Sequence, residues 1–266
     1  MSGWDTDGAE KMALASRDWA LGGSTGAGVR VAVVDTGVDT THPFLAGVIK
    51  RSARAVQVEG GQYEVREEEH RDTAGHGTAC AGIIHQVAPD AELWSVQVLG
   101  SDGRGSGDAF VAGLRWAIKQ RVDICSLSMG TTSARFFGTL HDLADEAYYH
   151  GVVLVVAAAN RPTMSFPALY PSVIGVSAVE EDDPLKLYYN RTPPVEFLAA
   201  GINVRVPQPN GGWATLTGNS FAAPRVSGLC ALIRARHPRF DTAGLKAVLR
   251  EIAEPRTKLN PAVGYP

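Results

Sequence analysis

Three residues with the side chains of an acid, a base and a nucleophile stand in short, glycine-containing strings of this 266-residue chain. Asp35 lies in Val-Val-Asp-Thr-Gly, His76 begins His-Gly-Thr, and Ser220 lies in Gly-Asn-Ser-Phe-Ala-Ala-Pro. A serine hydroxyl is a weak nucleophile at neutral pH unless an adjacent imidazole accepts its proton, and a carboxylate must fix the tautomer of that imidazole. The three strings therefore indicate nucleophilic catalysis, with Asp35, His76 and Ser220 as the catalytic residues.

The three residues occur in the order Asp, His, Ser, and the known classes of serine hydrolase differ in this order. In this order and in these strings, the chain resembles the subtilisin-like serine peptidases, the subtilase family, from about residue 13 to about residue 252. The resemblance implies a serine endopeptidase that cleaves peptides or proteins through an acyl-enzyme intermediate and needs no cofactor. It also implies a three-layer α/β/α fold.

The resemblance assigns an oxyanion donor as well. Asn160 follows the apolar run 152–159, and its amide would donate to the oxyanion together with the backbone N–H of Ser220. A lone Asn after a strand is commonly a turn residue. The string Pro-Ala-Leu-Tyr-Pro-Ser-Val-Ile, which begins at Pro167 as it does in the family, favours the oxyanion role.

Substrate backbone would bind by strand addition, since the family holds its substrates between two extended segments. The residues of this chain that match those segments are Gly103, Arg104, Gly105, Ser128, Met129 and Gly130. Ala159 and Ser165 stand where the family has glycines that line the primary specificity pocket. We therefore expect a shallower pocket that prefers a small or medium apolar side chain.

Several residues depart from the family pattern and leave other interpretations open. Asn219 replaces the usual Thr before the nucleophile, Phe221 replaces the usual Met after it, and Gly107 replaces a bulky residue that covers a more distant subsite. One alternative is a peptide-binding pseudoprotease with weak or no turnover, because Asn219 and the altered pocket would misplace the substrate. Another is a dedicated processing protease, or a transpeptidase, that acts on one partner peptide in the same cell.

Strand and helix signals alternate along the chain, which predicts an α/β fold: a doubly wound, mostly parallel sheet with helices on both faces. The predicted strands are Arg30–Asp35, 92–99, 123–129, 152–159 and 172–179. The predicted helices are 108–118 with Asp108 as its cap, 137–150, 220–236 and 241–252. Residues 51–71 are polar and are predicted to be a surface excursion. In such a sheet, ligands bind beyond the carboxyl ends of the strands, where Asp35, Asn160 and Ser128 are predicted to lie.

Length and composition favour one domain. The resemblance implies that it is a subtilisin-like peptidase domain over residues 1–266, with its core at about 13–252 and a C-terminal extension at 253–266. The net charge of −3 and the pI of about 6.2 argue against a nucleic-acid partner. No apolar run reaches membrane-spanning length, so no membrane partner is expected. The oligomeric state stays open.

Metal and redox chemistry are not expected. The stretch 81–89 after His76 lacks the insertion that often carries a calcium loop in the family, so no metal site is predicted. The three cysteines, Cys80, Cys125 and Cys230, are an odd number in apolar settings and do not form a disulfide framework. We therefore expect a cytoplasmic protein, or a secreted one if an N-terminal signal or pro-segment was trimmed. Cys80 is expected to be a small core residue, not a catalytic one.

Overall fold

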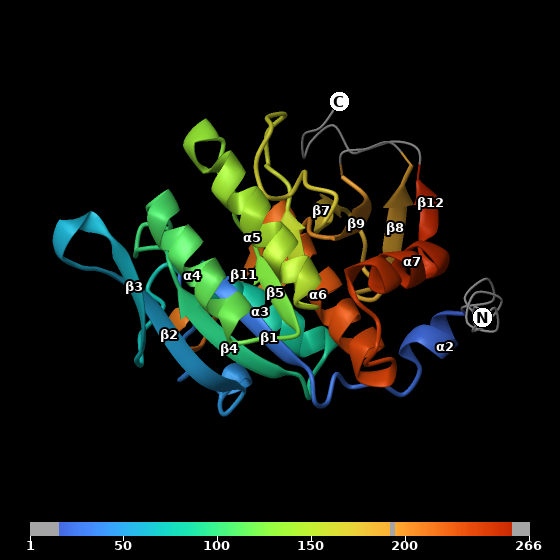
Figure 1. The fold of residues 1–266 in the computed structure, drawn as a ribbon. Coiled ribbons are helices and arrows are strands. Elements are labelled where there is room, and N and C mark those ends of the chain that lie inside the picture. The colour runs from blue at the N-terminus through green and yellow to red at the C-terminus, as the bar shows by residue number, and fades with distance from the viewer. Residues whose placement is uncertain (1–15, 192–194, 257–266) are drawn as a thin grey trace.

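The computed structural model describes residues 16–191 and 195–256, and a ten-stranded sheet runs through them (Figure 1). Its strands are β1 (Arg30–Asp35), β2 (Ile49–Gln57), β3 (Tyr63–Glu67), β4 (Glu92–Gln97), β5 (Ile124–Leu127), β6 (Val153–Ala157), β7 (Ile174–Val179), β8 (Leu187–Asn190), β9 (Phe197–Ala200) and β12 (Glu254–Arg256). Their order across the sheet is β12-β8-β9-β7-β6-β5-β1-β4-β2-β3. Only β2–β3 and β8–β9 pair antiparallel, so the predicted mostly parallel sheet is confirmed.

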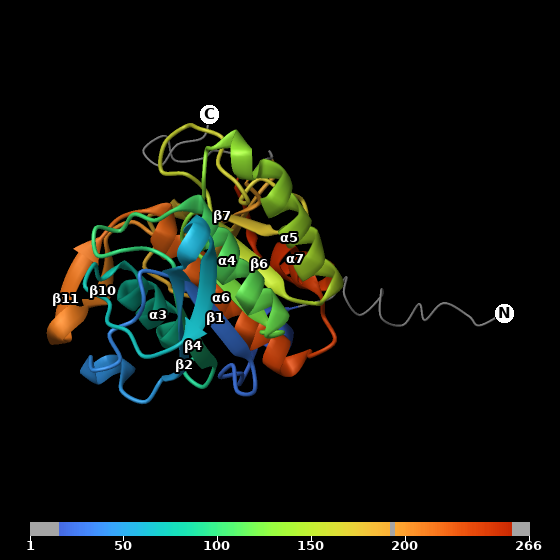
Figure 2. The same ribbon diagram turned by 60° about the vertical axis from the view of Figure 1, so that its left-hand side comes forward.

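Helices cover both faces of this sheet. One face packs against α2 (Arg17–Leu21), α3 (His76–Val87), α6 (Asn219–Arg236) and α7 (Thr242–Ile252), and the other packs against α4 (Gly107–Lys119) and α5 (Phe137–Tyr149). Four 3₁₀ turns and a hairpin complete the described elements: Pro43–Leu45, Glu59–Gly61, Ala134–Phe136, Pro209–Gly211, β10 (Val204–Gln208) and β11 (Gly212–Leu216). Figure 2 shows the hairpin projecting at the side of the molecule where α3 lies.

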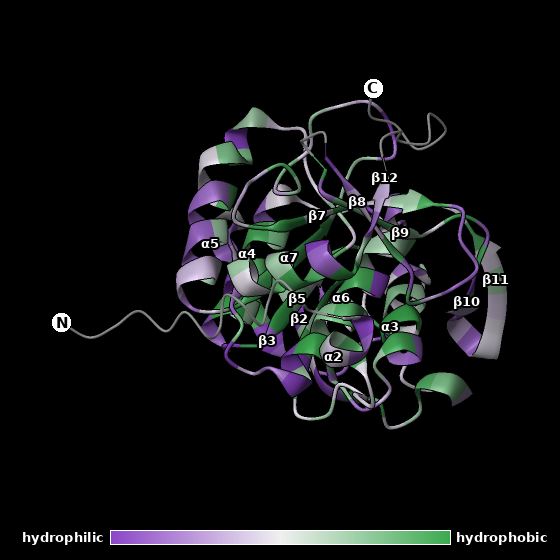
Figure 3. Ribbon diagram, turned by 90° about the vertical axis from the view of Figure 1, so that its right-hand side faces the viewer, coloured by the Kyte–Doolittle hydropathy of each residue, from purple (hydrophilic) through white to green (hydrophobic). Residues whose placement is uncertain are grey.

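The side-chain alternation of a strand divides the core into two clusters. Along β1, Val31 and Val33 pack with the α3 and α6 side, whereas Ala32 and Val34 pack with the α4 and α5 side. A strand with both faces covered has apolar residues at every position, which explains the continuous apolar runs in the sequence. Figure 3 shows the hydrophobic residues concentrated in the sheet and in α6, and hydrophilic residues on the outer turns of α5.

The predicted strands and helices are confirmed, with ends that differ by at most two residues, and two predictions are wrong. Residues 51–71 are not a surface excursion, because they include β3 and most of β2, which extend the sheet. β3 is the edge strand and β2 lies next to it, and most side chains of both strands are partly or fully exposed, so they tolerate the charged residues that suggested a loop. The cap of α4 is Ser106, whose Oγ accepts from Asp108 N at 3.0 Å, while Asp108 lies in the first helical turn.

The C-terminal part of the chain contributes to the sheet. Within the predicted extension, Glu254–Arg256 form the edge strand β12, which pairs in parallel with β8. Residues 257–266 of that extension, and 13–15 at the start of the predicted core, lie outside the described residues. No helix in the described part of the chain is both long and apolar enough to cross a membrane.

Candidate active site

The carboxyl end of β1 places an acid beside the first residue of α3. Asp35 is 1% exposed, and its Oδ1 lies 2.8 Å from His76 Nδ1. The same oxygen accepts the backbone N–H of Thr36 at 2.7 Å, which fixes the carboxylate. Gly75 caps the N-terminus of α3 with a φ of 86°, a conformation that strongly favours glycine. With Nδ1 bonded to Asp35, Nε2 is the nitrogen of His76 that remains for proton exchange.

Two opposing effects act on the pKa of His76. Burial disfavours the charged imidazolium and lowers the pKa, whereas the adjacent Asp35 carboxylate stabilises the imidazolium and raises it. The attraction prevails because the two groups share a short hydrogen bond, so the pKa of His76 lies above its ordinary value of 6.5. The imidazole can therefore hold a proton that it takes from a neighbouring group.

Ser220 is the second residue of α6, and reciprocal bonds tie it to Ser128. Its hydroxyl donates to the Ser128 carbonyl at 3.2 Å, and its carbonyl accepts from Ser128 Oγ at 2.7 Å. Cys80 lies between His76 and Ser220. Its Sγ is 4.0 Å from His76 Nδ1 and 3.5 Å from the Ser220 carbonyl oxygen. The structure thus brings Asp35, His76 and Ser220 to one place, with the Ser220 hydroxyl bonded to Ser128 and not to His76.

Asn160 reaches the same place from the end of β6. Its Oδ1 accepts the backbone N–H of Asn219 at 2.8 Å, which leaves Nδ2 as the donor that can serve a substrate. A Cβ atom at Gly218 would lie 3.6 Å from both Nδ2 and Oδ1 of Asn160. A side chain at this position would contact the Asn160 carboxamide, and glycine leaves that side of the carboxamide free.

Asn219 joins the two strands that flank this carboxamide, a role that the sequence did not reveal. Its side chain is fully buried, and its Oδ1 accepts from Ala178 N in β7 at 2.8 Å. Its Nδ2 lies 3.1 Å from the Ala158 carbonyl and 2.8 Å from the Ala159 carbonyl, just after β6. The carboxamide thus acts like an inserted peptide group where β6 and β7 separate. Threonine, the usual residue here, has one hydroxyl and cannot make all three bonds.

The first predicted substrate segment begins in a turn. Gly103 has a φ of 70°, and the Arg104 carbonyl accepts from Gly100 N at 2.7 Å. Gly105 lies directly against β4's end, since a Cβ there would be 2.6 Å from the Val98 carbonyl. This close approach requires glycine, so the glycines of the segment serve its own packing as well as any approach by substrate.

The second predicted substrate segment continues β5 and faces the predicted pocket residues. Ser128, Met129 and Gly130 follow the strand, and Ser165 Oγ would lie 3.4 Å from a Cβ at Gly130. Backbone bonds between Thr131 and Phe166 join the two walls just beyond this point. Ala159 is half-buried after β6. Backbone pairing therefore holds Ser165 beside Gly130.

Phe136 fills the space next to Gly107, the position where the family has a bulky residue. A Cβ at Gly107 would lie 2.2 Å from the Phe136 ring. Arg135 stacks on that ring at 5.0 Å and forms an ion pair with Asp108 at 3.1 Å. The glycine is thus a packing requirement for Phe136.

Comparison with known proteins shows the family of the chain. Residues 26–265 match the subtilase family, peptidase S8. The chain belongs to the subtilase family. It is 33% identical over 243 residues to subtilisin BL of Lederbergia lenta, covering 87% of this chain and 85% of that protein. It is 32% identical over 246 residues to subtilisin E of Bacillus subtilis, covering 87% of this chain and 62% of that protein.

Solved structures agree with this assignment. The solved structure of Sphericase superposes with a TM-score of 0.72 at 29% identity, covering 86% of this subtilase and 84% of that chain. S41 Psychrophilic Protease gives the same TM-score at 25% identity, with 87% of each chain covered. By family and by homologues, this subtilase is a subtilisin-like serine endopeptidase.

Mercuric ion is expected to inactivate this subtilase by binding Cys80. The Cys80 thiol and the potential ligand atoms of Asp35 and His76 lie within 4.8 Å of one another, so an adduct would displace the imidazole. Burial raises the pKa of the Cys80 thiol, so iodoacetamide should react slowly. We expect Cys80→Ser to lose at least about 90% of the mercury sensitivity and to keep most of its hydrolytic activity.

The measurement is residual peptidase activity against mercury concentration. Cys230→Ser is the matched control, because Cys230 is also buried and free but lies in α6, within the hydrophobic core. That variant should remain as sensitive as the wild type. Unchanged sensitivity in Cys80→Ser would show that the adduct forms elsewhere.

Proposed function

We propose that this subtilase hydrolyses peptide bonds with Asp35, His76 and Ser220 as a catalytic triad and Asn160 as an oxyanion donor. The 2.8 Å bond between Asp35 Oδ1 and His76 Nδ1 is the observation that carries the proposal. It orients the imidazole and stabilises its protonated form, as proton transfer from a serine requires. Because Ser220 lies in the first turn of α6, its oxygen also lies at the positive end of a helix dipole.

In the proposed mechanism, rotation of the Ser220 side chain moves Oγ from the Ser128 carbonyl to His76 Nε2. Oγ attacks the scissile carbonyl carbon while Nε2 takes its proton, and the carbonyl oxygen becomes an oxyanion. Asn160 Nδ2 and the Ser220 backbone N–H donate to that oxyanion. The tetrahedral intermediate collapses, and His76 protonates the departing amine. Water, deprotonated by His76, then attacks the acyl-enzyme, which releases the carboxylic acid and restores the Ser220 hydroxyl.

A fluorophosphonate probe tests this proposal against the pseudoprotease alternative. An active site phosphonylates at the nucleophile, so the wild type should be labelled at Ser220 and Ser220→Ala should not. Mass spectrometry of the labelled peptide gives the position. No labelling of the folded wild type, together with no cleavage of a peptide library, would favour the pseudoprotease.

A processing role in a reducing compartment is a finer proposal. Cys80, Cys125 and Cys230, which are all free and buried, support the reducing compartment but do not bear on the processing role. Cleavage of total cell protein by the purified enzyme tests it, with new N-termini identified by mass spectrometry. A dedicated protease should produce few sites with one shared sequence, whereas a broad distribution of sites would contradict the processing role.

The pH profile of hydrolysis should reflect the raised pKa of His76. The base must be neutral to accept a proton, so kcat/KM is expected to fall as the pH drops through this pKa, at values above the ordinary 6.5. In Asp35→Asn the attraction is removed, so the same limb should move to lower pH, while turnover falls by about 10⁴. The measurement is kcat/KM against pH for both proteins. A fall of wild-type kcat/KM that occurs only below pH 6.5 would contradict a raised pKa for His76.

Asn219→Ala is expected to lower kcat by about 10- to 100-fold with a smaller change in KM. The variant leaves the Ala158 and Ala159 carbonyls and the Ala178 N–H without their partner and loosens the strand end that carries Asn160. The effect should be less than additive with that of Asn160→Ala, because both changes act on one donor. Steady-state kinetics and melting curves measure this, and full additivity would contradict a positioning role.

A further inference from the structure

A surface groove of about 530 Å³ lies beside the candidate active site, and arginines dominate its charge. Arg54 from β2, Arg71 from the segment between β3 and α3, and Arg104 from the loop after β4 line it. No Asp or Glu is among the described residues that line this groove. The residues that line it therefore carry positive charge and no carboxylate.

The groove is continuous with the catalytic centre. A smaller cavity of about 350 Å³ is lined by His76 and Ser128, and Leu99 and Ser101 line both this cavity and the groove. The predicted substrate segment 103–105 borders both spaces as well. A peptide held along this segment with its cleaved bond at Ser220 therefore extends toward the arginines.

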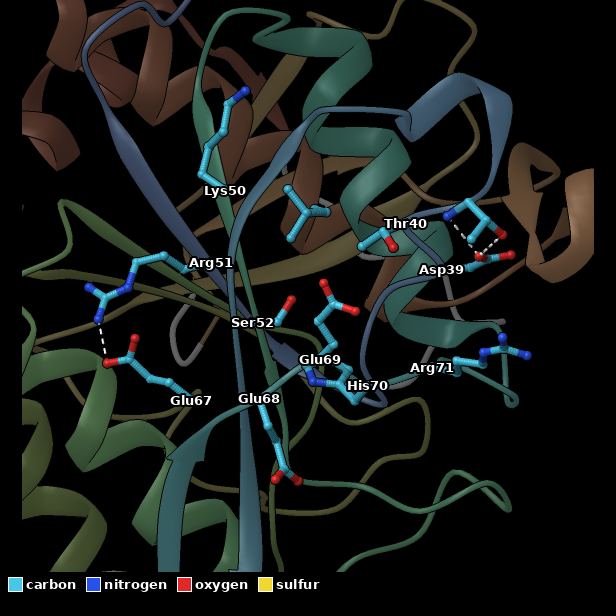
Figure 4. Close-up of a pocket in the computed structure, with 12 residues that line it drawn as sticks. Asp39, Thr40, Lys50, Arg51, Ser52, Glu67, Glu68, Glu69, His70 and Arg71 are labelled. Atoms are coloured by element: carbon cyan, nitrogen blue, oxygen red, sulfur yellow. Dashed lines mark hydrogen bonds and ion pairs between the residues drawn. The ribbon is translucent and has the colours of Figure 1, made fainter.

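Two of the three arginines are available to a ligand. Arg54 lies 3.7 Å from Glu68, and both side chains are about half exposed. Arg71 and Arg104 form no ion pair with any residue in the described ranges 16–191 and 195–256. Figure 4, a view of the neighbouring pocket, shows Glu67 bonded to Arg51 and the Arg71 guanidinium directed away from the glutamates. The nearby acidic residues thus leave Arg71 unneutralised.

We propose that this groove binds an acidic side chain, Asp or Glu, of the peptide substrate. The inference rests on the proposed function, because it takes the bond at Ser220 as the cleaved one. A guanidinium presents parallel N–H donors that match the two oxygens of a carboxylate. Each exposed arginine–carboxylate pair is worth about two- to fivefold in binding, so two pairs give a preference of about tenfold. Asp102 lines only the smaller cavity, so the acidic residue is preferred in the groove.

Peptides of one sequence, with Glu, Gln or Lys placed in turn at each position on the groove side of the cleaved bond, test the inference. We expect at least one position where kcat/KM for Glu exceeds that for Gln by about tenfold, with Lys lowest. The preference should weaken with added salt, since exposed charges are screened. Arg71→Glu and Arg104→Glu should each lower the Glu-to-Gln ratio and raise the Lys-to-Gln ratio.

Arg115→Glu is the matched control, because Arg115 is exposed on α4 and does not line the groove. It should leave both ratios unchanged. Equal cleavage of the Glu, Gln and Lys peptides at every position would overturn the inference and leave the proposed function intact. A Glu preference that survives both groove variants would overturn the assignment to these arginines. Absence of all cleavage and of fluorophosphonate labelling would instead overturn the proposed function.

Discussion

Ser220→Ala and His76→Ala are each expected to lower kcat by about 10⁶, and the double variant should lose little more. Attack on the carbonyl needs the hydroxyl and the base in the same step, so removing either stops the covalent route. The residual rate would come from substrate binding and the oxyanion donors alone. Peptide hydrolysis measured at enzyme concentrations high enough to detect slow turnover tests this, and so does the melting temperature of each variant.

Two exposed residues of the same types serve as controls for these substitutions. Ser133→Ala and His141→Ala change a serine before a 3₁₀ turn and a histidine on α5, and neither residue contacts the candidate site. Both variants should keep wild-type kcat. If the losses from Ser220→Ala and His76→Ala multiplied in the double variant, the two residues would act independently and the triad would be wrong.

Asn160→Ala is expected to lower kcat by about 10²–10³, or about 3–4 kcal/mol of transition-state stabilisation, with a small change in KM. A loss of this order accompanies removal of one oxyanion donor in a subtilisin, because the bond forms fully only when charge develops on the oxygen. Steady-state kinetics with a peptide substrate give both constants.

Asn160→Asp distinguishes the loss of the Nδ2 donor from the loss of the contact between Oδ1 and the Asn219 N–H. The aspartate keeps an oxygen that can accept the Asn219 N–H, but it has no N–H to donate and it adds a negative charge near the oxyanion. We therefore expect at least as large a loss of kcat as with alanine, while the fold is retained. Wild-type kcat in Asn160→Asp would show that Asn160 acts only through its contact with Asn219.

The sequence predicted that Asp35, His76 and Ser220 lie close together, which the structure shows, but it did not predict the contacts that hold them. The strings around Asp35, His76 and Ser220 are local, and each lies where a strand ends or a helix begins, so a parallel sheet brings them together. The bond of Ser220 to Ser128 and the insertion of Asn219 between β6 and β7 depend on how separate segments pack. Asn219 stood out only as a departure from the family, and its partners are known only once both strands are placed.

The same distinction explains the errors in the fold. The apolar runs of β1 and β6 are buried on both faces, so hydrophobicity alone reveals them. The strand β3 lies at the sheet edge with β2 next to it, and both carry charged residues at exposed positions, so their sequence is typical of a loop. Glu254–Arg256 is too short to show any periodicity, and pairing with β8 is what makes it a strand.

The position of α6 has a consequence for the synthesis of the protein. This helix packs against α3 and against β5, β6, β7 and β9, and it is buried along most of its length. Because a chain emerges from the ribosome N-terminus first, the acid and the base are made long before Ser220, which arrives with the last large piece of the core. We expect a nascent or truncated chain that lacks α6 to be unable to cleave anything. Proteolytic activity should therefore appear only with completed folding.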